Sequence, residues 1–473
     1  MELVYGVKDR PKAGRMLVFA LQQLLAILAA TIAVPIIVGN MSTSAALFGA
    51  GVGTIVYLLF TRFKSPVFLG SSFAFLGSMA SAFAGGVSMS LGYLGLIIGA
   101  VFAGLVYVII AIVVKFAGTK WIDKIMPAVV IGPTVAIIGL SLAKNAVGDL
   151  TGGGVLGVNN SLGLLCGIVT LAVTIVCSVY GKKMLKMIPF IIGILAGYVL
   201  ASIFTAFSYI DGAESMRLIN FEVFKQLGDA SAWYPDFTFL TAFSGGYDAG
   251  TKGSIGAYIG TIAVAYIPVA FVVFAEHIAD HKNISSIINQ DLLKDPGLHR
   301  TLLGDGIGSM AGALFGGCPN TTYGESVGCV AISGNASVVT IFTTACMAIL
   351  VSFIAPFVLF LGSIPSCVMG GVCIALYGFI AVSGLKMIQK VDLGDNRNLF
   401  IVSVILIAGV GGMVLTIGKV IITEVACALI LGILTNLLVN IGRKKKAAEG
   451  AEGGESVDAN ADQTAEPTEA EVN

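Results

Sequence analysis

The ten residues Gly316-Gly-Cys-Pro-Asn-Thr-Thr-Tyr-Gly-Glu325 interrupt an apolar part of the chain with glycines, a proline, polar side chains and an acid. A shorter interruption, Gly70-Ser-Ser72, lies in an apolar segment of the first half. Irregular backbone at membrane depth is tolerated only where it is buried in protein or lines a cavity. Paired interruptions in the two halves of a chain therefore indicate a transporter with its binding site between them.

The segments that precede the two interruptions support an internal repeat. Gly51-Val-Gly-Thr-Ile-Val-Tyr-Leu-Leu-Phe60 resembles Gly306-Ile-Gly-Ser-Met-Ala-Gly-Ala-Leu-Phe315 in its pattern of glycines and apolar residues. A glycine-rich match of this length can arise by chance, but both copies fall in the second predicted span of a half. The match therefore favours two related halves.

The composition is that of a protein whose solvent is a bilayer. Of the 473 residues, 56% are hydrophobic, 11% are charged and 60 are glycines, whereas a soluble domain carries about 25% charged residues. A hydropathy window of about 19 residues predicts fourteen membrane spans. Their approximate ranges are 15–38, 45–60, 68–84, 91–114, 126–142, 161–180, 187–209, 255–281, 301–316, 321–333, 337–361, 365–386, 399–416 and 420–442.

The positions of Lys and Arg support this count, because these residues are retained on the cytoplasmic side of short loops. With a cytoplasmic N-terminus, 22 of the 27 Lys and Arg residues fall in the predicted inside segments. The five that fall outside are Lys144, Arg217, Lys225, Lys252 and Lys419. We therefore expect a multi-pass protein of the plasma (inner) membrane with both termini in the cytoplasm.

The predicted fold is an all-α integral membrane protein with two repeats of seven spans. The external loop 210–250 separates the halves, and because seven is odd, the second half is inverted relative to the first. Spans 3 and 10, at 68–84 and 321–333, are the broken spans, which we expect to contain short extended stretches. Residues 1–14 form a cytoplasmic N-terminus. Residues 447–473 are rich in Glu, Asp, Ala and Gly, which predicts a disordered cytoplasmic tail.

Three acids inside predicted spans stand out, because an ionisable group there costs roughly 2.5–3.5 kcal/mol or more. Glu276 and Asp280 are four residues apart and share one face of the eighth span, whereas Glu325 lies in the broken tenth span. Two close carboxylates in a low dielectric need a proton or a metal cation to relieve their repulsion. This pair is the predicted cation-coupling site. The alternative is that this turn already lies at the cytoplasmic interface, where acids are cheap.

Other chemistry is only weakly indicated. His277 and His281 form a second pair with four-residue spacing, and His299 follows in a loop. No third metal ligand follows at a useful spacing and the eight cysteines form no CxxC pair. We therefore predict interfacial histidines, no metal site and no cofactor. Zero net charge without a basic patch argues against a nucleic-acid partner. The sequence also shows no nucleophile–base pair of the kind that an enzyme would need.

The broken spans combine flexible backbone with polar and aromatic groups. Ser72 and Phe73 follow the first interruption, and Tyr323, Gly324 and Glu325 end the second. Unwound backbone exposes N–H donors that can bind a ligand carbonyl, and an aromatic ring can stack on a planar ligand. Simple packing of the two aromatic residues is an equally good interpretation. Gln22, Gln23 and Glu424 are more easily explained by hydrogen bonds between helices.

Four motifs in order resemble the nucleobase–ascorbate transporter family, in the branch of the uracil–proton symporters. They are Leu69-Gly-Ser-Ser-Phe-Ala-Phe75, Ala275-Glu-His277, Asp295-Pro-Gly-Leu-His-Arg300 and Pro319-Asn-Thr-Thr-Tyr-Gly-Glu-Ser-Val-Gly328. The similarity extends from about Gly6 to Arg443. It implies a secondary active transporter that imports uracil by cation symport with alternating access, and that forms a homodimer.

The resemblance also implies that the spans form two domains with different roles. Spans 1–4 (15–114) and 8–11 (255–361) would form a substrate-carrying core, and spans 5–7 (126–209) and 12–14 (365–442) a gate domain. Glu276 and Glu325 would bind the two ring N–H groups of uracil. Backbone amides near Phe73 and Gly324 would bind its carbonyls, with Phe73 and Tyr323 lining the ring, and Ser72 is a further expected substrate-binding residue.

Two positions depart from the family pattern. Asp280 and Gln23 stand where the best-known bacterial uracil symporters carry histidines. The residues expected to couple the cation are therefore Glu276, Asp280 and Gln23, with a proton as the preferred ion and Na⁺ as the alternative. A relative for xanthine, urate or another pyrimidine is the first rival function. An anion transporter is disfavoured because Glu276 and Glu325 would repel an anion. A channel is disfavoured because the sequence shows no repeated pore filter.

Overall fold

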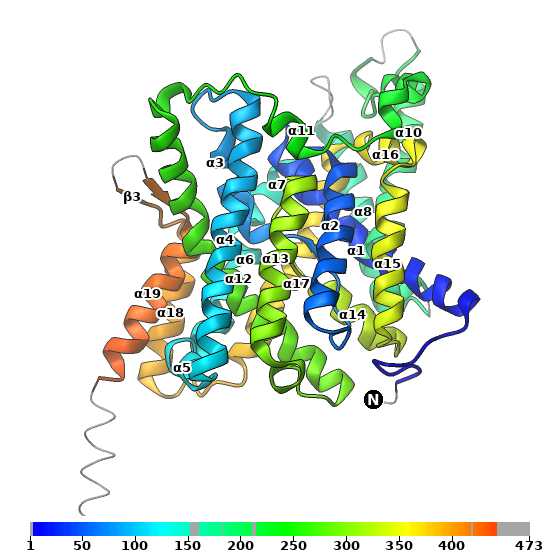
Figure 1. The fold of residues 1–473 in the computed structure, drawn as a ribbon. Coiled ribbons are helices and arrows are strands. Elements are labelled where there is room, and N and C mark those ends of the chain that lie inside the picture. The colour runs from blue at the N-terminus through cyan, green and yellow to red at the C-terminus, as the bar shows by residue number, and fades with distance from the viewer. Residues whose placement is uncertain (1–2, 152–159, 183, 211–213, 418–419, 442–473) are drawn as a thin grey trace, which may run out of the picture.

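The computed structural model describes residues 3–151, 160–182, 184–210, 214–417 and 420–441. The predicted tail, 447–473, lies outside these residues. The helices run roughly parallel to one another, and the N-terminal segment and the end of the last helix lie at the same end of the molecule (Figure 1). An even number of crossings follows from this placement of the two ends.

The first half consists of long helices interrupted by one short strand. Its elements are α1 (Ala13–Val38), α2 (Thr43–Phe60), β1 (Leu69–Ser71), η1 (Phe73–Phe75), α3 (Leu76–Phe83), α4 (Met89–Ala117), α5 (Lys120–Ile125), α6 (Ala128–Ser141), α7 (Ala143–Thr151), α8 (Asn160–Tyr180), α9 (Met184–Met187) and α10 (Pro189–Phe207). The connection to the second half contains η2 (Glu214–Met216), η3 (Phe221–Gly228), η4 (Ala230–Trp233), α11 (Thr238–Ala242) and η5 (Gly250–Lys252).

The second half repeats the pattern of long helices around a short strand. Its elements are α12 (Ile255–Ile288), η6 (Leu293–Gly297), α13 (Leu298–Gly316), β2 (Asn320–Thr322), α14 (Gly324–Ser333), α15 (Val338–Val351), α16 (Ala355–Gly362), α17 (Ser366–Ile388), α18 (Asn396–Val410), β3 (Leu415–Ile417), β4 (Val420–Ile422) and α19 (Glu424–Val439).

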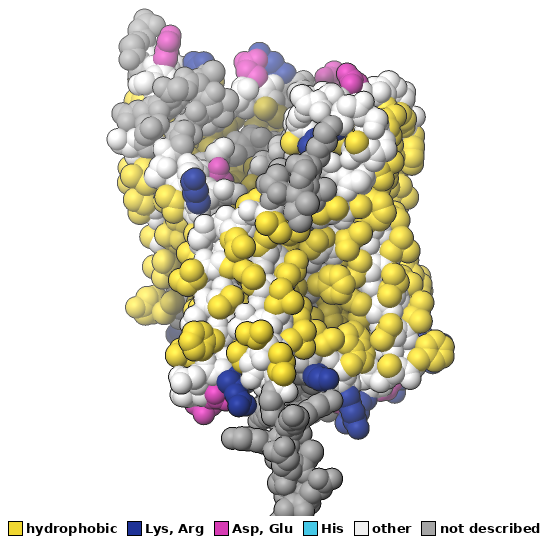
Figure 2. Space-filling view, turned by 90° about the vertical axis from the view of Figure 1, so that its left-hand side faces the viewer, with side chains coloured by type: hydrophobic (Ala, Val, Ile, Leu, Met, Phe, Trp, Pro, Cys, Tyr) yellow, Lys and Arg dark blue, Asp and Glu magenta, His cyan; other side chains and the backbone are white. Residues whose placement is uncertain are grey.

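The chain is mostly helical and spans a membrane several times. In the described residues, eight helices are long and apolar enough to cross a bilayer, and α15 with α16 makes a ninth candidate that bends by 84°. Shorter apolar helices cover 73–83, 396–410 and 424–439. Exposed apolar side chains on α4, α8, α10, α18 and α19 belong to the outer surface, and Figure 2 shows one face with a broad apolar belt that has Lys and Arg side chains at its lower edge.

The last two predicted spans, 399–416 and 420–442, are wrong in their inner boundaries. Helix α18 ends at Val410, and α19 begins only at Glu424. Between them β3 and β4 pair as an antiparallel hairpin. The physical reason is Gly411-Gly412 followed by β-branched residues, because Gly412 adopts a φ of 66° that ends a helix.

The two predicted interruptions contain the strands β1 and β2, which pair with each other. The strands are antiparallel, with Leu69 opposite Thr322 and Ser71 opposite Asn320, and every residue in them is buried. The ladder continues at both ends, where the Ser72 amide donates to the Pro319 carbonyl at 2.9 Å and the Tyr323 amide to the Phe68 carbonyl at 3.2 Å. The expected short extended stretches are thus present and satisfy each other's backbone groups.

The strands are held by a close contact between α2 and α13, the helices that carry the internal match. A Cβ on Gly53 would lie 2.7 Å from the Gly308 carbonyl oxygen, and a Cβ on Gly308 would lie 2.7 Å from that of Gly53. Only glycine allows the two backbones to approach this closely, as at other membrane helix contacts with small residues. The repeated glycines therefore serve packing between the halves.

The N-terminal segment is tied to the second half as well. Tyr5 forms a parallel bridge with Asn335, in the connection between α14 and α15. The Val4 amide donates to the Gly334 carbonyl at 2.8 Å, and the Val338 amide donates to the Val7 carbonyl at 3.1 Å. The segment thus lies across the end of the half-helix α14.

We expect Gly53→Leu to destabilise the protein by about 1–3 kcal/mol, because the new side chain overpacks the α2–α13 contact. Thermal unfolding of the purified protein in detergent measures the change. Gly260→Leu is the matched control, since nothing lies within 4 Å of its added Cβ. Equal unfolding temperatures for the two variants would contradict the packing role.

Candidate functional site

A cavity of about 270 Å³ lies beside the two strands, between α12, α14, α10 and α17. This volume is near the lower end of small-molecule sites, which span about 300–1,000 Å³. The cavity extends towards the last turns of α8, α12 and α17, where Ser178, Asn283 and Ser383 line it. Its outer end therefore lies towards the end of the molecule that carries the N-terminus (Figure 1).

Six of the eight predicted site residues line this cavity. They are Phe73, Glu276, Asp280, Tyr323, Gly324 and Glu325. Ser72 and Gln23 lie outside the lining. Both are buried, so the structure places them behind the cavity wall.

The three acids come from two elements that face each other. Glu276 and Asp280 lie one turn apart on α12, and Asp280 Oδ2 accepts a hydrogen bond from the Thr322 hydroxyl of β2 at 2.8 Å. Glu325 lies in the first turn of α14, where the helix dipole stabilises a negative charge. Asp280 is only 9% exposed. The alternative that this turn lies at the solvent interface is therefore wrong.

Both broken spans present a helix N-terminus next to the strands. The helical turn η1 begins at Phe73 and α14 begins at Gly324, so each chain passes from strand to helix at the cavity. The first N–H groups of a helix have no partner within that helix. They can therefore donate to a ligand carbonyl, a group that the facing carboxylates would repel.

The two aromatic residues have different roles. The Tyr323 hydroxyl donates to the Ser71 carbonyl at 2.9 Å, so this side chain braces the two broken spans against each other. The ring of Phe73 contacts the ring of Tyr377 on α17 edge to face, with centroids 5.4 Å apart. Phe73 is thus the point where the first broken span meets the helices on the other side of the cavity.

Gln23 supports the site through Ser326. Its Nε2 donates to Ser326 Oγ at 2.6 Å, and the same oxygen accepts from the Phe68 amide at 3.0 Å. One hydroxyl therefore links α1, the chain entering β1 and the first turn of α14. This geometry fixes the position of Glu325, the neighbour of Ser326.

Sequence reasoning missed several polar residues of the cavity and the surroundings of the histidines. The missed lining residues include Ser178, Lys186, Asn283 and Ser383. Most lie at the ends of spans, where polar residues are common and therefore do not indicate a binding site. His277 and His281 are completely buried, so the prediction of interfacial histidines is wrong. Within the described residues, no three His, Cys, Asp or Glu side chains are placed to hold a metal ion.

Comparison with known proteins identifies the family. The permease family profile matches residues 14–418. The chain belongs to the nucleobase–ascorbate transporter family of permeases. As a member of that family it is a transporter and not an enzyme.

Two relatives and one solved structure illustrate the similarity. The uracil permease of Bacillus caldolyticus is 40% identical over 440 residues, which cover 92% of this chain and 94% of the relative. The uracil permease of Escherichia coli K12 is 33% identical over 462 residues, covering 96% and 98%. The transmembrane domain of the cyanobacterial bicarbonate transporter BicA has a similar fold, with a TM-score of 0.60 and 15% identity over 90% of this permease and 97% of that chain.

We expect Ser326→Ala to destabilise this permease by about 1–3 kcal/mol, because Gln23 Nε2 and the Phe68 amide lose a buried acceptor. Thermal unfolding measures the stability, and ligand binding to the purified protein should weaken in parallel as α14 loses its anchor. Ser202→Ala on α10 is the control, because this hydroxyl donates to the Tyr198 carbonyl of its own helix. Unchanged stability and binding in Ser326→Ala would show that this hydroxyl does not position the half-helix.

Proposed function

We propose that this permease imports uracil by symport with a cation. The observation that carries the proposal is the arrangement of two carboxylates, Glu276 and Glu325, opposite each other in one cavity with two helix N-termini beside them. Uracil presents two ring N–H donors and two carbonyl acceptors in alternation. Carboxylates suit the donors and free backbone N–H groups suit the acceptors. The similarity to uracil permeases supports the same substrate.

The roles of the individual residues follow from this arrangement. Glu276 and Glu325 accept from the ring N–H groups, and the amides at Phe73 and Gly324 donate to the carbonyls. Phe73 and Tyr323 border the planar ring, and Ser72 shapes the turn behind Phe73. No covalent step is required, because recognition and movement suffice for transport.

The proposed mechanism is alternating access in a fold of fourteen spans with two inverted repeats. The packing of α2 on α13 and of α4 on α12 and α13 supports a core of 15–114 and 255–361. The packing of α6, α7 and α8 on α17 and of α18 on α19 supports a gate of 126–209 and 365–442. The core carries the strands, and the cavity separates it from the gate. We propose that the protein works as a homodimer in the plasma (inner) membrane with both termini cytoplasmic, so that this cavity is open inwards.

The cation is proposed to bind at Glu276 and Asp280, with Gln23 acting indirectly through Ser326. Thr322 already donates to one oxygen of Asp280, which leaves the second oxygen to bind a proton or Na⁺. A proton is the preferred ion, because a buried carboxyl group next to a second acid favours its neutral form.

Uptake of labelled uracil into proteoliposomes, with proton and sodium gradients imposed separately, tests the function. We expect uptake with a proton gradient that unlabelled uracil inhibits and xanthine does not. Uptake that xanthine blocks, or uptake under neither gradient, would overturn the uracil assignment. Uptake that depends on the sodium gradient alone would replace the proton by Na⁺.

Glu325→Gln should reduce uracil affinity by at least about 100-fold, because a charged acceptor is replaced by an amide that faces a ring N–H donor. Equilibrium binding of labelled uracil to the purified variant measures the loss. Asn283→Ala, which also changes a cavity residue but lies a turn beyond the acids, is the control and should bind uracil nearly normally. Unchanged affinity in Glu325→Gln would show that the substrate site is elsewhere.

Asp280→Asn should separate substrate binding from coupling. The amide keeps the hydrogen bond from Thr322 but cannot bind a proton, so uracil binding should persist while the accumulation driven by a proton gradient falls. Comparing uracil exchange with proton-driven uptake in the same proteoliposomes measures this separation. Full proton-driven accumulation in the variant would exclude Asp280 as the coupling residue.

A further inference from the structure

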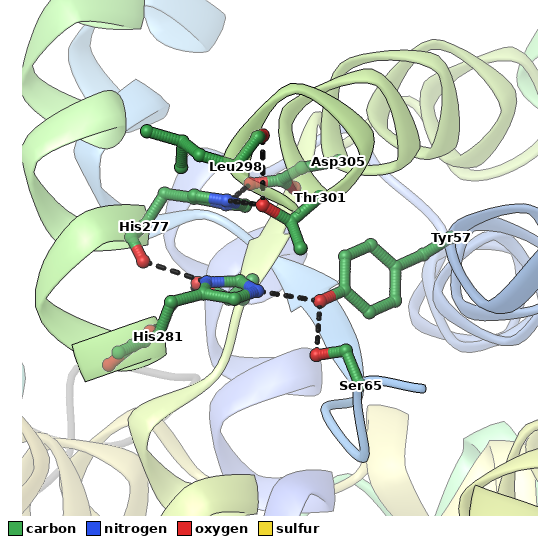
Figure 3. A network of polar contacts seen from close by, with 9 residues as sticks. Tyr57, Ser65, His277, His281, Leu298, Thr301 and Asp305 are labelled. Atoms are coloured by element: carbon green, nitrogen blue, oxygen red, sulfur yellow. Dashed lines mark hydrogen bonds and ion pairs between the residues drawn. The ribbon is translucent and has the colours of Figure 1, made fainter. Parts of the chain in front are cut away.

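A buried polar network lies beside the acids of the cavity, on the neighbouring face of α12, because His277 and His281 follow Glu276 and Asp280 by one residue. His277 Nδ1 lies 2.7 Å from Asp305 Oδ2 on α13, and His277 Nε2 lies 3.0 Å from the Thr301 hydroxyl. Figure 3 shows the contacts from the His277 ring to both partners, with the His281 ring below it. His277 and Asp305 are 0% and 1% exposed, and neither lines the cavity.

The hydrogen bonds indicate where a proton lies. The Thr301 hydroxyl lies 3.0 Å from the Leu298 carbonyl and 3.0 Å from His277 Nε2. When it donates to the carbonyl, its oxygen accepts from His277 Nε2–H. With a proton on Nε2, a neutral His277 presents a lone pair at Nδ1. A lone pair cannot lie 2.7 Å from a carboxylate oxygen without repulsion, so a second proton must lie between Nδ1 and Oδ2. The pair therefore holds one proton more than a neutral histidine next to an ionised acid.

The burial of His277 and Asp305 also favours the presence of this second proton. Without this proton the pair would carry a net negative charge inside the protein, which is costly unless a cation compensates it. Asp305 Oδ1 has no hydrogen-bond partner among the described residues. Asp305 lines a second cavity of about 10 Å³, together with Tyr107, Ser309 and Asn320. With the proton bound, the pair is neutral overall and this oxygen carries less charge.

Other ionisable groups surround the pair on several sides. The His281 ring stacks on His277 with centroids 4.0 Å apart, and the Tyr107 ring meets it edge to face at 6.1 Å. The His281 Nδ1–H donates to the His277 carbonyl at 2.8 Å, and Nε2 lies 2.7 Å from the Tyr57 hydroxyl, which lies 2.6 Å from Ser65 Oγ. The groups facing the pair are Tyr57 from α2, Tyr107 from α4, and Glu276, Asp280 and His281 from α12.

We propose that His277 and Asp305 form a second proton-binding site of this permease, outside the substrate cavity, which loads and releases one proton in each transport cycle. The inference rests on the transport function proposed above. Its link to the substrate is short, because His277 adjoins Glu276 in the chain and Asp305 shares the small cavity with Asn320 of β2.

Asp305→Asn tests the proposal with little change of shape. The new amide donates to His277 Nδ1, so the hydrogen bond of the loaded pair persists while the exchangeable proton is lost. We expect a folded protein with normal uracil binding and normal uracil exchange. Each coupled proton contributes about a tenfold accumulation ratio per pH unit of gradient, so the ratio should fall by about that factor. Ser309→Ala, which lines the same small cavity, should keep the unchanged ratio.

His277→Gln is a second variant, which should lower the accumulation ratio by the same factor. It tests the proton-binding site if Asp305→Asn does not fold. Folded variants that keep the ratio of the unchanged permease would overturn the proposal. A folded Asp305→Asn that no longer binds uracil would also overturn it, since the pair would then serve the substrate. Failure of the unchanged permease to bind or take up uracil would instead overturn the proposed function, so the two failures are distinguishable.

Discussion

The whole arrangement depends on the need to satisfy backbone hydrogen bonds in an apolar interior. A break in a membrane helix leaves N–H and C=O groups without partners, and no water is available to replace them. Here the backbone groups at Leu69–Ser71 and at Asn320–Thr322 form hydrogen bonds with each other, because the two breaks pair as antiparallel strands. Because the solution needs both breaks, the two halves of the chain must meet at this point. The candidate site is built around that meeting.

The surrounding contacts all serve to hold the strands at a fixed depth and orientation. Close approach of α2 and α13 brings the two halves together, the Tyr323 hydroxyl braces one break against the other, and the Ser326 hydroxyl connects α14 with α1. As a result, Glu325 reaches the cavity from a half-helix that is anchored on three sides. Glu276 and Asp280 reach it from the continuous helix α12. The acids therefore keep their relative positions if the core moves as a unit.

Much of this could be predicted from sequence, and the successes share a cause. Glycine, proline and acids are so costly within membrane spans that their positions stand out, which is why the sequence predicts both breaks and the three acids of the cavity. Asp305, an acid in the predicted span 301–316, is passed over by the same reasoning. The failures have causes too. The polar residues at the open end of the cavity lie where polarity is normal, and the hairpin β3–β4 was read as part of two apolar spans because β-branched residues are apolar as well. His277 and His281 are buried against Asp305, Thr301 and Tyr57, which come from other helices. The sequence around the two histidines therefore does not indicate their burial.

The pairing of the N-terminal segment with the connection after α14 has a consequence for synthesis of the protein. Tyr5 leaves the ribosome long before its partner Asn335 has been made. The strand β1 likewise waits for β2, about 250 residues later. Until then the first half has an unpaired strand and a loose N-terminal segment. The early helices must therefore remain able to rearrange in the membrane until α14 arrives, and completion of the core is a late event in the assembly of the chain.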